Sequence, residues 1–115
     1  MKKLIIATLI TLMLAGSSFG GQTAISSGEQ TADAAIYSGS ADITAIQVCT
    51  DGINDGKVII YDNTTDSGKV VFEATVTGAS HYGGRVFVPP IEVSNGIYVD
   101  VTGTGASYFV EYARN

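Results

Sequence analysis

The stretch that decides the fold is residues 57–77, which read KVIIYDNTTDSGKVVFEATVT. Two runs rich in β-branched and aromatic residues flank a cluster of Asn, Thr, Asp, Ser and Gly. Such runs are typical of strands, and the small polar residues supply the local hydrogen bonds and positive φ angles of turns. Because side chains alternate between the two faces of a strand, we expect every second residue of the second run to face a core. These residues are Val70, Phe72, Ala74 and Val76.

The same pattern recurs about every ten residues along the rest of the chain. It predicts strands at residues 34–38, 43–50, 57–62, 70–77, 85–89, 96–102 and 107–112. Short strands at this spacing favour an all-β fold, an antiparallel β-sandwich of about seven strands. Both an immunoglobulin-like and a jelly-roll topology satisfy the pattern. Pro89-Pro90 donates no ladder hydrogen bonds, so the chain there either leaves the sheet or runs along an edge.

The chain divides into three parts. Residues 1–20 have a basic tip, an apolar run and small residues at the exit, which is the pattern of a secretory signal peptide. Residues 21–34 are rich in Ser, Thr, Gly and Ala, and we expect a flexible leader or an arm that orders on a partner. Residues 35–115 form the predicted sandwich domain.

Charge excludes two classes of partner. Two of the six Lys and Arg lie in residues 1–20, and the remaining four stand against eleven Asp and Glu, a net charge of about −7. Such a surface repels phosphate groups, so we expect no binding of nucleic acid or of anionic membrane surfaces. The apolar run of the signal-like segment is also too short for a stable membrane span.

No catalytic arrangement is evident, and we expect the protein not to be an enzyme. His81 is the single histidine, and its neighbour Ser80 is poorly placed to meet it because adjacent side chains rarely face one another. Cys49 is the single cysteine, so it forms no internal disulfide; a small apolar packing role is favoured over an intermolecular disulfide.

We expect no cofactor, with calcium as the weaker alternative. The turn at residues 51–56 and the acidic turn with Asp62, Asn63 and Asp66 contain the oxygen ligands that calcium prefers. The ligand spacing does not match a calcium loop, however, and hydrogen bonding within each turn explains these residues better.

Five aromatic residues fall opposite the predicted core positions or in loops. A cluster of three or more on one surface would make a candidate interaction surface, since aromatic side chains anchor contacts at low entropic cost. The alternative is that they fill the edges of the core. These residues are Tyr61, Tyr82, Phe87, Tyr98 and Phe109.

The order of strands and turns resembles that of small β-sandwich proteins encoded by tailed bacteriophages. The resemblance rests on residues 45–48, 51–52, 58–63, 67–71 and 95–106. It implies a structural, non-enzymatic virion component that decorates a capsid or tail and docks on other protein subunits. A homo-oligomer or larger assembly would then form, with the arm or the terminal strand adding to a neighbour's sheet.

The signal-like start departs from the pattern of such virion proteins. It favours the alternative, an exported sandwich module, extracellular or on a cell surface, that recognises a glycan or a host protein. Localisation on the virion surface and export therefore both stand as expectations.

Overall fold

The computed structural model describes residues 23–115, so the predicted signal segment lies outside the described residues. Within them the chain forms eight strands and one short 3-10 helix, and no α-helix. The elements are β1 (Ile25–Ser26), β2 (Ala34–Ser38), β3 (Ala41–Cys49), β4 (Gly56–Asp62), β5 (Lys69–Val76), η1 (Gly78–Ser80), β6 (Tyr82–Val93), β7 (Gly96–Thr102) and β8 (Ser107–Arg114).

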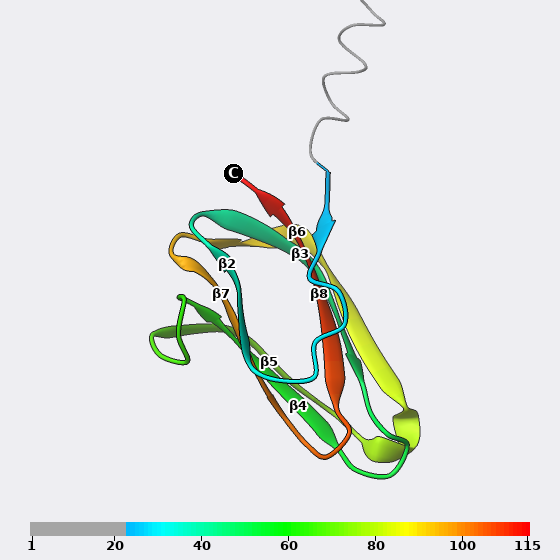
Figure 1. The fold of residues 1–115 in the computed structure, drawn as a ribbon. Coiled ribbons are helices and arrows are strands. Elements are labelled where there is room, and N and C mark those ends of the chain that lie inside the picture. Colours follow the sequence, from blue (N-terminus) through cyan, green and yellow to red (C-terminus); the bar gives the residue numbers. More distant parts are fainter. Residues whose placement is uncertain (1–22) are drawn as a thin grey trace, which may run out of the picture.

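The strands form two antiparallel sheets that pack face to face, as Figure 1 shows. One sheet has the order β1-β8-β3-β6, and the other has the order β2-β7-β4-β5. The predicted all-β antiparallel sandwich is thus confirmed. No helix of residues 23–115 is long and apolar enough to cross a membrane.

The pairing of the strands identifies the topology as a jelly roll rather than an immunoglobulin-like fold. β4 pairs with β5, β3 with β6, β2 with β7 and β1 with β8, all antiparallel. These nested pairs describe one long hairpin that has been rolled up. The β3–β8 ladder joins the pairs β1–β8 and β3–β6 into one sheet of four strands, and the β4–β7 ladder joins β2–β7 and β4–β5 into the other.

β1, which is additional to the seven predicted strands, lies in the segment expected to be a flexible leader or arm. Ile25 and Ser26 pair with Tyr112 and Glu111 of β8, and Gln30 forms an isolated bridge with Tyr108. These residues lie on the chain's own sheet. β8 itself lies between β1 and β3, so the C-terminal strand is not an edge that could add to a neighbour's sheet.

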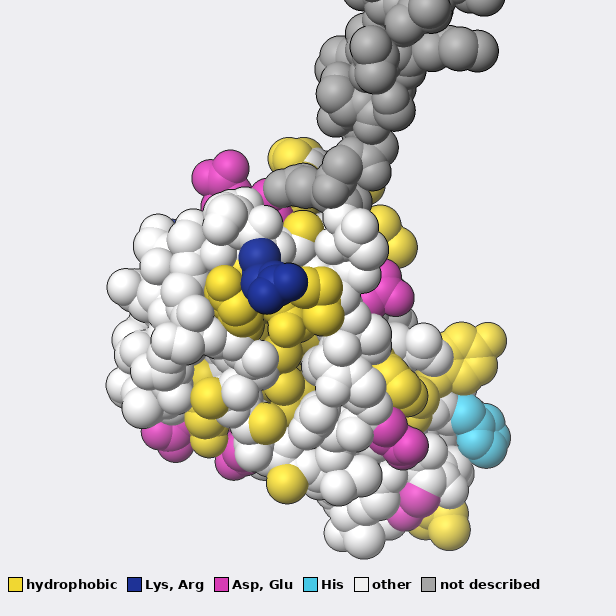
Figure 2. All heavy atoms as spheres, turned by 45° about the horizontal axis from the view of Figure 1, so that its top comes forward, with side chains coloured by type: hydrophobic (Ala, Val, Ile, Leu, Met, Phe, Trp, Pro, Cys, Tyr) yellow, Lys and Arg dark blue, Asp and Glu magenta, His cyan; other side chains and the backbone are white. Residues whose placement is uncertain are grey.

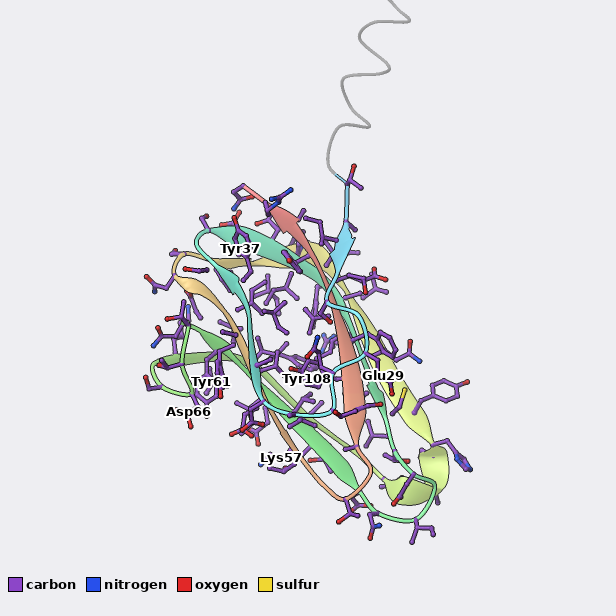
Figure 3. All side chains as sticks on the ribbon, viewed as in Figure 1. Glu29, Tyr37, Lys57, Tyr61, Asp66 and Tyr108 are labelled. Atoms are coloured by element: carbon purple, nitrogen blue, oxygen red, sulfur yellow. The ribbon has the colours of Figure 1, made fainter. Side chains whose placement is uncertain are left out.

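The core lies between the sheets and follows the alternation of the strands. Val58 and Ile60 of β4, which is an inner strand, are fully buried, as are Ile97 and Val99 of β7. Tyr108 is fully buried between the layers (Figure 3), where its hydroxyl donates to the carbonyl of Ala32 at 3.3 Å. Burial raises the pKa of that hydroxyl.

Register shifts explain where the expected core positions are wrong. The β4–β5 ladder shifts between Ile60 and Tyr61, so Val70 lies outside the alternation and is 46% exposed. The β3–β6 ladder shifts between Ile43 and Ala45, where residues 87–90, which include Pro89-Pro90, form a bulge opposite Thr44. β6 is an edge strand, which is one of the two arrangements that Pro89-Pro90 predicted.

Candidate functional site

The structure does not bring the five predicted aromatic residues together. Tyr61 and Tyr98 pair edge to face on the outer side of the β2-β7-β4-β5 sheet, with ring centroids 6.3 Å apart. Tyr82 and Phe109 lie on the outer side of the other sheet, where both line one groove. The two pairs are therefore separated by the thickness of the sandwich.

Phe87 is buried in the core rather than exposed, which corrects its place in the predicted surface set and agrees with the alternative that these residues fill the core. Its ring meets that of Phe72 edge to face, with centroids 5.1 Å apart. The reason is the register with β3. Val86 pairs with Ala45, whose side chain faces outwards, so Val86 also faces outwards and Phe87 faces the core.

The groove on the β1-β8-β3-β6 sheet has a volume of about 520 Å³. Its lining comes from adjacent strands in register. Glu111, Ala45 and Val86 lie side by side across β8, β3 and β6. Phe109, Gln47 and Gly84 form the next row.

Small residues make this face hollow. Ala45 and Gly84 leave space in the middle of the sheet, and the larger side chains of Phe109 and Tyr82 rise beside it. A side chain at Gly84 would approach the backbone oxygen of Ile46 to 3.0 Å, so a larger residue is disfavoured there. The alternation of apolar and polar residues along β3 and β8 implies that Gln47 and Glu111 face outwards. That they line one groove follows only from the pairing of β3 with β8, which the sequence did not show.

The two outer faces differ in charge. Asp33, Asp66 and Asp100 gather on the β2-β7-β4-β5 side, where burial and the neighbouring Asp33 carboxylate raise the pKa of Asp100. Lys57 and Glu73 form an ion pair at 2.7 Å on the same sheet. Figure 3 shows Tyr61 and Asp66 on this side of the molecule.

The groove carries far less charge than the opposite face. Among its lining residues, Glu111 and Arg85 are the charged ones. Figure 2, which looks at the end of the molecule that is at the top of Figure 1, shows apolar side chains around a basic side chain, with Asp and Glu mainly towards the rim. Less charge has to be desolvated when another surface covers the groove than when one covers the acidic face.

The residues considered for catalysis do not meet. His81 is exposed and has a φ of 65°, and its carbonyl accepts a hydrogen bond from the Thr50 amide at 2.7 Å. The Ser80 hydroxyl lies 2.8 Å from that of Thr77. Cys49 is a free, partly buried thiol on the outer side of β3, beside Ser107 and Tyr82. This arrangement offers no nucleophile with an adjacent base.

The two acidic turns lie at opposite ends of β4, and hydrogen bonds within the protein occupy the carboxylates of Asp51, Asp55 and Asp62. Asp51 accepts from the backbone N–H of Ile53 at 2.9 Å and of Asn54 at 2.7 Å. These bonds, that of Asn54 first, lower the pKa of Asp51 below its ordinary value. In residues 23–115 no three His, Cys, Asp or Glu side chains are grouped so as to hold a metal ion.

Comparison with known proteins adds no identity. No family model, no curated protein and no solved structure matches the chain. The function therefore has to be argued from the geometry of the two faces.

Proposed function

We propose that the protein is a non-enzymatic structural component of a phage-type virion, a decoration protein that docks on other protein subunits. It binds through the groove face, defined as the outer face of the β1-β8-β3-β6 sheet. The observation that supports this proposal is the contrast between a hollow, weakly charged face and an acidic one on the same jelly roll. Jelly rolls are a common architecture of viral shells, which adds support by analogy of fold alone.

The chemistry of the groove face suits a protein partner. Phe109 and Tyr82 offer aromatic contact area, and Gln47 offers an amide that both donates and accepts hydrogen bonds. Interfaces commonly combine aromatic anchors with a few polar groups and little charge at their centre. A protruding loop or strand of a shell subunit would fill the hollow over Ala45 and Gly84.

A fractionation experiment tests the proposal. Particles from the culture that produces the protein are purified on a density gradient, and peptides from residues 35–115 are quantified by mass spectrometry. We expect the protein in the particle fraction at a fixed ratio to the major shell protein. Its recovery only in the particle-free supernatant would contradict the virion role.

The same groove also favours a second candidate, a secreted or cell-surface module that binds a glycan. Aromatic rings beside amide and carboxylate groups are suited to stacking and hydrogen bonding with sugars. Recovery in the supernatant, with binding on a glycan array that Tyr82→Ala abolishes, would favour this function. Tyr98→Ala, on the opposite face, is the matched control because its side chain lies outside the groove.

A further inference from the structure

Residues 82–86 of β6 are the least protected stretch of strand edge in residues 23–115. The other edges carry the devices that usually prevent pairing with another chain, namely shortness, irregularity and charge. β1 has two residues, β2 has a register shift between Ala35 and Tyr37, and β5 carries Lys69 and Glu73. Residues 82–86 of β6 pair with β3 without a shift and contain no proline and no acidic residue.

Hydrogen bonding to β3 shows which backbone groups of β6 point to the free side. The Thr50 amide donates to the His81 carbonyl, so His81 faces β3. The N–H and C=O of one residue point to the same side of an antiparallel strand, and the side alternates with each residue. Gly83 and Arg85 therefore bond β3. The remaining residues present their N–H and C=O groups to the free edge: Tyr82, Gly84 and Val86.

This edge is complementary to itself around Gly84. When two copies of the strand pair antiparallel about a two-fold axis at Gly84, Tyr82 of each copy lies opposite Val86 of the other. The three residues whose groups face outwards would then form about six hydrogen bonds across the axis. Tyr82 and Val86 are 66% and 71% exposed, and aromatic pairs with β-branched residues stabilise sheets.

Charge also favours a second copy of this acidic chain at this edge. From Thr75 to Ile91 the sequence has no Asp or Glu, and Arg85 is its single Lys or Arg. Two molecules whose residues 21–115 carry a net charge of about −7 repel each other least where acidic groups are absent. The bulge at residues 87–90 limits the pairing to the regular part of the strand.

We propose that residues 82–86 of β6 pair with the same residues of a second copy, joining two β1-β8-β3-β6 sheets into one continuous sheet. Because the two-fold axis runs perpendicular to the sheet, both groove faces lie on the same side of the dimer. The dimer thus presents two docking faces in parallel, which raises avidity for a repetitive surface. This inference deepens the proposed docking role. Its test uses the purified chain without particles, so the dimer and the docking role can fail independently.

The test measures the mass of the purified chain by light scattering from about 1 μM to about 1 mM, together with amide hydrogen exchange. We expect a dimer whose amides at Tyr82, Gly84 and Val86 exchange slowly, whereas in a monomer those three amides are free. The amides of Gly83 and Arg85, which bond β3, are protected in both states and serve as internal controls.

Two variants locate the interface. Val86→Pro removes an outward N–H that β3 does not use, and Val86→Lys places a charge at the edge. Both should give a folded monomer with the circular dichroism spectrum of the wild type and a melting temperature that no longer depends on concentration. Val70→Lys, the same exchange on exposed β5, should remain a dimer. A monomeric mass of the wild type up to about 1 mM, or a dimer in which the three amides exchange freely, would overturn the proposal.

Discussion

At the scale of the residue, Asp62 shows how single carboxylates fix the turns of this fold. It ends β4, and its carboxylate accepts from the backbone N–H of Ser94 at 3.0 Å and of Asn95 at 2.8 Å. Those residues connect β6 of one sheet with β7 of the other. Partial burial opposes the charged form, but the amide donors outweigh it, so the pKa of Asp62 lies below its ordinary value.

We therefore predict that Asp62→Asn lowers the free energy of unfolding by about 1 kcal/mol at neutral pH. A carboxyl whose pKa is depressed by folding stabilises the protein above its unfolded pKa, and this contribution is lost as the pH falls through the folded pKa. The difference between wild type and variant, measured by urea unfolding, should thus shrink towards zero as the pH falls below the ordinary pKa of an aspartate. Asp66→Asn, at an exposed aspartate, is the control; a difference for Asp62→Asn that persists in acid would contradict the explanation.

At the scale of the element, alternation predicted most strands but not how they are joined. The core faces of β7 and β8 followed directly from their sequences, because Ile97, Val99, Tyr108 and Val110 recur at period two. The inward face of β6 did not follow, since either Val86 and Val88 or Arg85 and Phe87 satisfy the same period. Pairing of Val86 with Ala45 decides between them, and that is a long-range property.

The first strand also could not be predicted from local sequence. Residues 23–33 hold few large apolar side chains, and their order comes from hydrogen bonds to β8 instead. Ser27 N donates to the Val110 carbonyl at 2.8 Å, and Gln30 N donates to the Tyr108 carbonyl at 2.9 Å. Tyr108 N donates in turn to Gln30, and Val110 N to the Ser27 hydroxyl.

Deletion of residues 23–33 should therefore destabilise the domain. The deletion also removes the acceptors of the Tyr108 hydroxyl at Ala32 and of the Val101 amide at Asp33. Six hydrogen bonds at roughly 0.5–1.5 kcal/mol each predict a loss of about 3–9 kcal/mol in the free energy of unfolding. Chemical denaturation of the two forms measures it. An unchanged midpoint would contradict a stabilising role of this segment in the chain's own sheet.

At the scale of the whole molecule, the jelly roll presents two outer faces that differ in charge and shape. The sequence indicated the sandwich, since turns recur at a regular spacing, but it left the topology open. It also indicated Tyr82 and Phe109 as surface residues, yet it could not show that Gln47 and Gly84 lie beside them. That juxtaposition arises because β8, β3 and β6 are neighbours in the sheet although they are distant in the chain.

The proposed docking role assigns binding of the assembly to the groove face. The copy number of face variants in purified particles tests this assignment. Gln47→Lys places a charge in the middle of the groove, and Thr75→Lys places the same charge on the opposite sheet, where β5 is exposed. We predict that Gln47→Lys lowers incorporation about tenfold, corresponding to about 1.4 kcal/mol, while Thr75→Lys stays at the wild-type level. Equal incorporation of both variants, or an equal loss in both, would contradict the assignment of the groove face.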